Sequence, residues 1–362
     1  MNNARPFIII PPGEILKDEL DERGWTQDEF ADIIGRPIQV VNEIIKGKKA
    51  ITPETAVLFS AALGTSADFW LNLENSFRLD LIFHEKQDRS DISLKARIFE
   101  LAPVKEMVKR KWITGFTSTD ELHTKILRFY DIPDLDQLKP LSARLRKAKT
   151  KYSSDPSIRA WQRKAEIEAE KLKVKKYSKA LLSKLADKLA LISGSTNDAD
   201  TAAVPALLAE TGVRFVLLPH LSKTSVDGAA FWIEGKFPVI AMTLRLDRKD
   251  NFWFTLLHEI AHLLNKDTRV DIDLYHQELD AVEIKANEFA ANHLIPEEKY
   301  QEFLDETEPL FTRNRVKSFA EKIGVHPSIV VGRLQYDEKI PWSNLRNLME
   351  SIRPVFAKYI TQ

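Results

Sequence analysis

The chain has 362 residues, 44% of them hydrophobic and 29% charged, so it is too long for one compact core and predicts two or three folded units. Its 53 basic residues balance its 53 acidic residues, so net charge neither favours nor excludes a nucleic-acid partner. The absence of cysteine excludes disulfides and thiolate metal sites, which leaves histidine and carboxylate as the strong metal ligands.

The N-terminal apolar run is short. Residues 7–10 are stopped by Pro11-Pro12-Gly13 and follow no basic leader. Such a run is too short for a signal peptide or a membrane span, and no later apolar stretch reaches about 18 residues. We therefore expect a cytoplasmic protein with no membrane partner.

A small helical domain is predicted over residues 1–80. Apolar residues recur at helical spacings between Gly24, Gly35, Gly47 and Gly64, which mark the breaks between short helices.

Within this domain, residues 26–47 have the pattern of a helix, a glycine turn and a second helix, with Thr26 as N-cap. In a helix-turn-helix motif the second helix enters the major groove, so we expect Gln39 and Asn42 to contact bases. The residues expected to contact phosphates are Gln27, Arg36, Lys46, Lys48 and Lys49. Acidic residues outnumber basic ones in this segment, so a motif used only for dimerisation or protein docking stays open.

Residues 12–16, 42–44, 47–49 and 64–73 carry a family resemblance. Through them, the segment from about Pro12 to Asn75 resembles the HigA-type antitoxins of the Cro/repressor class. The resemblance implies binding to operator DNA, usually as a homodimer, and pairing with a toxin ribonuclease.

Residues 81–195 are interpreted as a helical connector, because helical patterns continue from about Ile98 to Ile192. Basic residues crowd the stretch from Lys139 to Lys184. Such a run either adds nonspecific phosphate contacts or forms a solvated helix face.

Residues 196–362 are expected to combine a small sheet with helices. The predicted strands are residues 213–218, 229–233 and 239–244, which are short runs bounded by glycine and proline. Helices are predicted over residues 251–265 and 279–294 and from residue 314 onward. The fold class is therefore mainly α with a small β-sheet (α+β).

The predicted helix at residues 251–265 carries two histidines, His258 and His262, four residues apart on one apolar face, where they can chelate one ion. Glu259 lies between them. In this pattern Zn²⁺ lowers the pKa of its bound water from about 15.7 toward about 7, and the carboxylate takes the proton as water attacks a carbonyl. The pattern predicts peptide hydrolysis; the alternative is a helix with two partly exposed histidines.

A third ligand is needed, because a catalytic zinc usually has three protein ligands and one open position. Glu283 is our candidate, since the helical spacing of the next segment lets it point toward the first helix. Asn287, one turn later, could hydrogen-bond the far nitrogen of a ligating histidine.

Residues 226–229, 254–262, 283–290, 294–296 and 325–335 carry a second resemblance. Through them, the segment from Val213 to Trp342 resembles the ImmA/IrrE family of metallopeptidases. The resemblance implies zinc held by His258, His262 and Glu283, Glu259 as general base, and a protein substrate, often a transcriptional repressor.

Three further features leave alternatives open. The predicted strand at 239–244 could offer a free edge to an extended substrate or be an interior strand. No spacing selects an oxyanion donor among Tyr275, His276, His293, His326 and Arg333, and His84, His123 and His220 are interpreted as structural. A second helix-turn-helix-like pattern at 316–334 is also interpreted as structural.

We therefore expect a zinc-dependent endopeptidase coupled to a DNA-binding transcriptional regulator, cleaving a protein partner such as a repressor. The alternative is a non-proteolytic antitoxin, or a repressor of a toxin-antitoxin operon, whose metal domain senses or scaffolds. Glu259 favours the enzyme, because a scaffold does not need the base.

Overall fold

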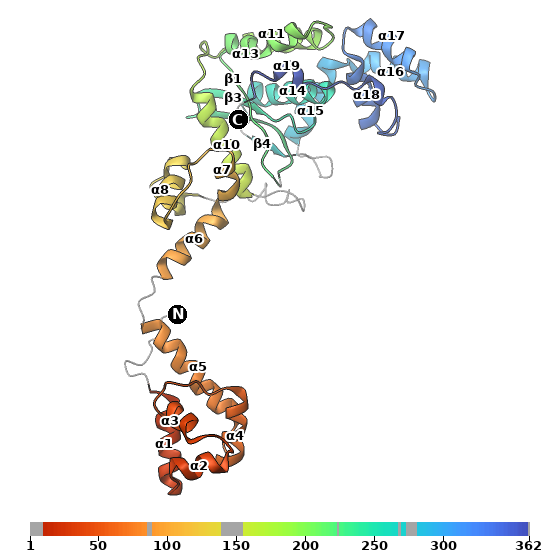
Figure 1. Cartoon of the computed structure of the whole chain (residues 1–362). Helices are drawn as coiled ribbons and strands as arrows, with labels where there is room; N and C mark the ends of the chain where they lie inside the picture. The colour runs from red at the N-terminus through yellow and green to blue at the C-terminus, as the bar shows by residue number, and fades with distance from the viewer. Residues whose placement is uncertain are drawn as a thin grey trace. The chain divides into compact units, whose positions relative to one another are not determined.

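The computed structural model describes residues 10–84, 89–138, 155–222, 224–266, 269–272 and 281–360. Contacts divide the chain into two compact units, Met1–Ile92 and Ser93–Gln362. Helices dominate both units and the second holds a small sheet (Figure 1), so the predicted fold class is confirmed. The three-part division at residues 1–80, 81–195 and 196–362 stays a prediction.

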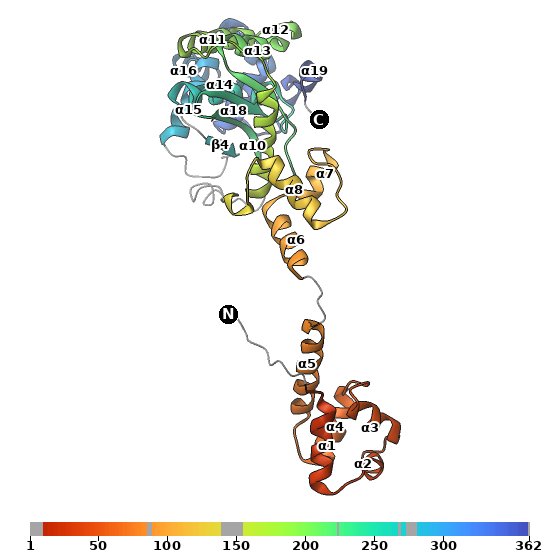
Figure 2. The ribbon, with the colours of Figure 1, turned by 90° about the vertical axis from the view of Figure 1, so that its left-hand side faces the viewer.

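Unit 1 is a helical bundle. Its helices are α1 (Pro12–Arg23), α2 (Gln27–Ile33), α3 (Ile38–Ile45), α4 (Pro53–Leu63) and α5 (Ala67–His84). At the centre of the bundle the ring of Phe59 packs against those of Phe30 and Trp70, with centroids 5.3 Å apart in both pairs. Figures 1 and 2 show α5 continuing beyond the other four helices.

The glycines that were predicted to separate these helices do so: Gly24, Gly35, Gly47 and Gly64 all have positive φ. A left-handed residue that ends a helix is least strained when it lacks a Cβ. The predicted helix breaks are therefore confirmed.

Helix α2 begins with a capping box, which confirms Thr26 as its N-cap. The Thr26 hydroxyl accepts a hydrogen bond from the backbone N–H of Glu29 (3.2 Å), and the Glu29 carboxylate accepts one from the N–H of Thr26 (2.7 Å). These bonds from Thr26 lower the pKa of Glu29. The start of the helix-turn-helix is thus defined by reciprocal polar contacts.

The sheet of unit 2 has the strand order β1-β3-β2-β4. Its strands are β1 (Arg214–Leu217), β2 (Val226–Ile233), β3 (Phe237–Met242) and β4 (Arg269–Ile272). β1 and β3 are parallel, whereas β2 is antiparallel to both β3 and β4. The three predicted strands are confirmed, and β4 was not predicted. The hypothesis that β3 offers a free edge is wrong, because β3 lies between β1 and β2.

Helices cover both faces of this sheet. The helices from the unit boundary onward are α6 (Arg89–Leu101), α7 (Val104–Lys109), α8 (Thr119–Tyr130), α10 (Asp155–Glu170), α11 (Lys179–Ile192), α12 (Asp198–Ala202), α13 (Val204–Thr211), α14 (Lys249–Asn265), α15 (Ala281–Leu294), α16 (Glu297–Thr307), α17 (Arg313–Ile323), α18 (Pro327–Tyr336) and α19 (Arg353–Phe356), with short 3₁₀ turns at Leu135–Gln137 and Arg346–Leu348. On one face Ala230, Ile240 and Met242 pack against α14 and its neighbours. On the other, Phe231 and Val239 pack against α6 to α10, so most of the predicted connector is part of the fold of unit 2.

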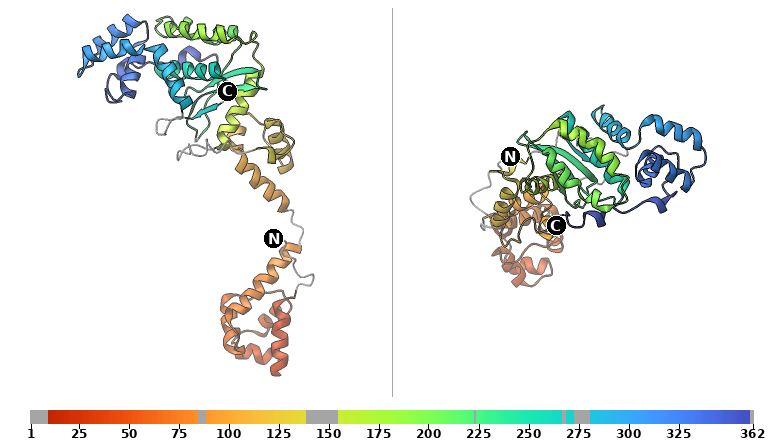
Figure 3. Two further views of the ribbon diagram at one scale, coloured as in Figure 1. Left: turned by 180° about the vertical axis from the view of Figure 1, so that it is seen from behind. Right: turned by 90° about the horizontal axis from the view of Figure 1, so that it is seen from above.

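The second helix-turn-helix-like pattern forms α17 and α18. Within α18, Val330, Val331 and Leu334 are fully buried in the same core as α14. A Cβ at Gly332 would lie 2.5 Å from the carboxylate of Asp250 at the start of α14. Figure 3 shows the blue helices of this region gathered at one end of unit 2. This packing supports the structural interpretation of the pattern.

The C-terminal segment is tied to the turn between β3 and α14. Asp247 accepts hydrogen bonds from the backbone N–H groups of Ile352 and Arg353 (both 2.9 Å) and from the hydroxyl of Ser351 (2.7 Å). Burial raises the pKa of Asp247, but these bonds outweigh it and leave the pKa lowered. Farther on, Ile360 forms a parallel bridge with Leu217 at the outer side of β1.

Among the described helices, none has both the length and the apolar character needed to cross a bilayer.

Replacing Thr26 with alanine should lower the free energy of opening of α2 by about 1 kcal/mol, because one N-terminal N–H loses its acceptor. Native-state hydrogen exchange of the α2 amides would measure this change. Thr26→Ser keeps the hydroxyl and should change the free energy of opening of α2 little.

A lowered carboxyl pKa stabilises the folded state above the unfolded pKa, so the contribution of Glu29 should be lost as the pH falls below about 4. Equal protection of the α2 amides from exchange in Thr26→Ala and Thr26→Ser would contradict the role of Thr26 as the cap.

Candidate metal centre

Helix α14 carries the histidine motif through the interior of unit 2. Its apolar residues on either side of the motif, among them Phe252, Leu256, Ile260 and Leu263, are at most 1% exposed. Burial of this apolar surface, rather than helix propensity, therefore holds the helix in place. The two histidine rings are consequently presented from a rigid element.

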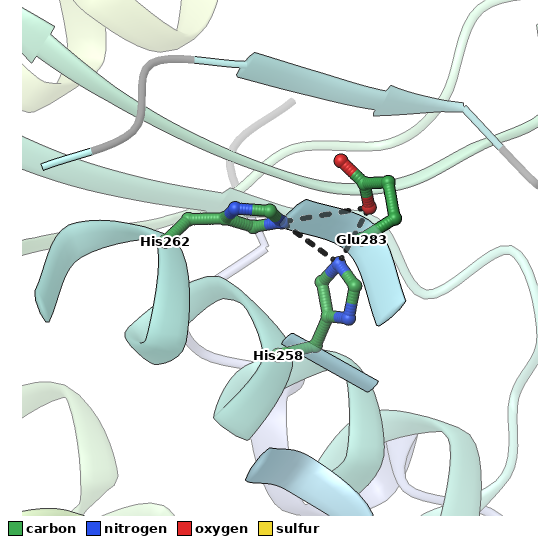
Figure 4. A group of neighbouring side chains, drawn as sticks. All are labelled: His258, His262 and Glu283. Atoms are coloured by element: carbon green, nitrogen blue, oxygen red, sulfur yellow. Dashed lines mark hydrogen bonds and ion pairs between the residues drawn. The ribbon is translucent and has the colours of Figure 1, made fainter. Parts of the chain in front are cut away.

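Three side chains converge beside α14. Figure 4 shows His258 and His262 from α14 and Glu283 from α15 pointing toward one another. The two Nε2 atoms lie 3.0 Å apart, and Oε2 of Glu283 lies 3.3 Å from Nε2 of His258 and 3.6 Å from Nε2 of His262. His258 is 7% exposed, His262 0% and Glu283 5%, so the cluster is buried. The structure thus brings together the three residues named as ligands from the sequence.

The donor atoms of this cluster fit a tetrahedral metal ion. Zinc bonds of about 2.0–2.2 Å place neighbouring tetrahedral ligands about 3.4 Å apart, close to the three distances in the cluster. Two imidazole nitrogens and one carboxylate oxygen form a donor set that suits zinc better than Mg²⁺ or Ca²⁺, which prefer oxygen ligands. A divalent cation would also offset the cost of burying the carboxylate. The residues present therefore fit a bound metal ion.

Glu259 follows His258 on α14 and is fully buried. Its carboxylate lies against the backbone of β2 at Gly228, where a Cβ would come within 2.4 Å of Oε1. Thr255, one turn earlier on α14, touches the same point of the strand. The carboxylate is therefore held between the metal helix and the sheet.

Asn287 lies on α15 one turn after Glu283 and is half-buried. Among the described residues, no hydrogen bond joins its amide to either imidazole ring. Its contact with a ligating histidine stays a prediction.

Three of the five residues considered as oxyanion donors have other partners. His293 bonds the carbonyl of Phe289 through Nδ1 (2.8 Å) and lies 3.5 Å from Asp187. His326 caps α18 and lies 3.2 Å from Glu350, and burial lowers its pKa. Arg333 bonds Asp337 (2.6 Å). The contacts of His293 with Asp187 and of His326 with Glu350 tie together separate parts of the fold. Tyr275 and His276 lie outside the described residues.

His123 and His220 do not belong to the cluster. Within the described residues, His258, His262 and Glu283 form the group whose spacing suits a metal ion. The pKa of His220 is lowered by burial and by the nearby cations of Arg245, Arg110 and Arg353. His123 is half-buried on α8, and the side chain of His84 lies outside the described residues.

The residues predicted to contact DNA lie on or beside α2 and α3. Those that are exposed are Arg36, Gln39, Lys46, Lys48 and Lys49, and those that are half-buried are Gln27 and Asn42. Two of the cations have acidic neighbours, since Arg36 lies 3.6 Å from Glu54 and Lys49 lies 3.9 Å from Glu43. These contacts reduce the positive charge offered by the motif, and the roles of these residues stay predictions.

Two parts of the chain match known domain families. A family model for a helix-turn-helix domain matches residues 16–70, and one for an IrrE N-terminal-like domain matches residues 209–335. The second match contains the histidine motif, Glu283 and all four strands of the sheet.

Individual relatives match the N-terminal unit. The chain is 37% identical over 68 residues to the uncharacterized HTH-type transcriptional regulator YddM of Escherichia coli, covering 19% of this chain and 72% of that protein. It is 34% identical over 76 residues to antitoxin HigA-1 of Vibrio cholerae, covering 21% and 69%. Among solved structures, the antitoxin HigA of Pseudomonas aeruginosa with the higBA promoter is 28% identical, covering 23% of this chain and 92% of that chain, with a TM-score of 0.22.

Purified protein supplied with zinc should hold about one ion per chain, because the cluster offers three ligands to one centre. His262→Ala and Glu283→Ala should each lose that ion, as measured by elemental analysis after loosely bound metal is removed. His293→Ala and Glu288→Gln change the same residue types on α15 away from the donor atoms and should keep it. A wild-type protein that stays metal-free would contradict the site.

Proposed function

Since the chain belongs to the helix-turn-helix regulators that include the HigA antitoxins and joins to that domain an IrrE N-terminal-like domain, we propose that it is a zinc-dependent endopeptidase coupled to a DNA-binding regulator. The observation that carries this proposal is the buried cluster of His258, His262 and Glu283 with Glu259 on the same helix. Its substrate is a protein partner, such as a repressor, and its place of action is the cytoplasm, where operator DNA is found.

In the proposed mechanism His258 and His262, each through Nε2, and Glu283, through Oε2, would hold the ion. A zinc ion held there would supply a bound water of lowered pKa and Lewis-acid polarisation of a peptide carbonyl. Glu259 accepts a proton from the attacking water as the new C–O bond forms. It then returns that proton to the leaving amine nitrogen as the C–N bond breaks.

The substrate backbone is proposed to pair with β4, in place of the edge that the sequence suggested at β3. β4 is the last strand of the described sheet on the side away from β1, and an outer strand can add an extended peptide. Its backbone at Asp271 pairs with Gly228, which itself lies against Glu259. A peptide added at this edge would lie two strand spacings, about 10 Å, from the strand that contacts Glu259.

Unit 1 is proposed to bind operator DNA through α3, as a homodimer, and to pair with a toxin ribonuclease. Exposed Gln39 and half-buried Asn42 are suited to adenine, because their amides can both donate to N7 and accept from N6. Arg36, Lys46 and Lys48, together with Gln27, would contact phosphates and set the register of the helix in the groove.

A second candidate function is a non-proteolytic antitoxin or repressor whose metal domain senses or scaffolds. The relatives that favour it match the N-terminal unit. The peptidase explains Glu259 better, since a metal site that only senses or scaffolds has no need of a base on the same helix.

Glu259→Gln should abolish cleavage while keeping zinc, because the amide cannot accept the proton from water; a loss of at least about 100-fold in rate is expected. Zinc-loaded wild type and variant would each be incubated with proteins from the source cell, and new N-termini counted by mass spectrometry. Glu288→Gln makes the same chemical change at an exposed position of α15 and should cleave like wild type. Equal sets of new N-termini from wild type and Glu259→Gln would support the second candidate instead.

Gln39→Ala should weaken binding by about 1–3 kcal/mol at one base pair and relax the preference there, because a base contact is lost. Lys46→Ala should instead weaken binding to all DNA sequences alike. It should also reduce the slope of log affinity against log salt concentration by about one unit. Fluorescence anisotropy on duplexes selected from a random pool would separate the two patterns. If Gln39→Ala left the preference unchanged, α3 would not be the reading helix.

A further inference from the structure

Gly228 lies at the point where β2 meets the metal helix. A Cβ built on it would lie 2.4 Å from Oε1 and 3.1 Å from Cδ of Glu259, and 2.8 Å from Cγ2 of Thr255. Real Cβ atoms do not approach other heavy atoms so closely. The carboxylate of Glu259 therefore occupies the space that a side chain at residue 228 would take.

A β-bulge in β2 directs residue 228 toward α14. The register between β2 and β4 shifts between Val226 and Gly228. In a regular strand Val226 and Ala230 would point to the same face, yet Val226 packs in the core beside α10 and Ala230 in the core beside α14. The extra residue reverses the phase of the strand, so Gly228 shares the face of Ala230 and meets Glu259.

Two residues after β3 hold the bulge. The backbone N–H of Thr243 donates to the carbonyl of Asp227 and its hydroxyl donates to the carbonyl of Val226, both at 2.8 Å. Arg245 forms a bidentate pair with the carboxylate of Asp227, at 3.0 and 2.8 Å. Thr243 is 3% exposed, so its bonds are protected from water. The bulge is therefore fixed from the β3 side.

We propose that Gly228 is a positioning residue that sets the place of the Glu259 carboxylate, and that the Thr243 and Arg245 contacts keep the bulge in the form that allows it. This inference rests on the proposed role of Glu259 as base. The core around α14 prevents the helix from retreating, so a methyl group at residue 228 displaces the flexible carboxylate.

The contact itself is tested by a double-mutant cycle on the zinc-loaded full chain. Gly228→Ala should lower the Tm of unit 2 in the wild-type background by several degrees, and by less than half as much in Glu259→Ala, where the methyl fills the space left by the carboxylate. The loss of Tm that remains in the Glu259→Ala background reflects the contact of the new methyl group with Thr255. Gly115→Ala, where nothing lies within 4 Å of the added Cβ, should leave the Tm unchanged. Equal losses in both backgrounds, or a double variant that fails to fold, would overturn the proposal.

The position of the base is tested with acetohydroxamate, a small zinc chelator whose N–H and O–H can bond a nearby carboxylate. Its affinity for the zinc-loaded protein should fall about tenfold or more in Glu259→Gln, because a charge-assisted hydrogen bond is lost. In Gly228→Ala the affinity for acetohydroxamate should fall by a similar factor, while the zinc content stays unchanged. Thr243→Val removes the hydroxyl bond without adding bulk at residue 228. It should also lower the affinity for acetohydroxamate.

The two hypotheses fail differently in this experiment. If Glu259→Gln binds acetohydroxamate as tightly as wild type, Glu259 is not beside the ion and the proposed function fails. If Glu259→Gln weakens binding but Gly228→Ala and Thr243→Val do not, the base is in place without them and only the present inference fails.

Discussion

The burial of four ionisable side chains between α14, α15 and the sheet is the constraint on which unit 2 depends. His258, Glu259, His262 and Glu283 are at most 7% exposed, and desolvating such groups costs several kcal/mol each unless charge and hydrogen bonding compensate. The surrounding structure must therefore hold these groups to within a fraction of an ångström. The fully buried apolar residues of α14, the close contact of Gly332 with Asp250 and the packing of β2 against Glu259 all serve that requirement.

The sequence was most informative where local periodicity and function coincide. The spacing of His258 and His262 predicts one helix face, and Glu283 could be identified because its own helix has a regular apolar pattern. The same holds for unit 1, where Thr26 and the glycine breaks have local causes that do not depend on distant residues. The ligand roles themselves stay predictions, but the structure brings their atoms together as the spacing required.

The sequence did not predict which elements pair or pack with one another across long sequence separations. The position of β3 inside the sheet depends on which strands pair, and no property of residues 239–244 encodes that order. β4 has only four residues among charged neighbours, too few for an alternation to be recognised. Gly228 looked like part of a family motif or a turn, whereas its role depends on a bulge and on a side chain 31 positions away. The sequence of the helices before the sheet has an apolar pattern. That pattern does not reveal that the apolar faces of these helices pack against the sheet.

The bridge between Leu217 and Ile360 makes the two sides of the sheet unequal. It places Ile360 beside β1, while the outer side of β4 has no strand partner among the described residues. An unpaired strand edge is where foreign chains add to a folded protein, so under the proposed function a substrate peptide and a second copy of this chain would compete for β4. Under the proposed function, self-association at high protein concentration would then slow the cleavage of substrate, and dilution would restore it.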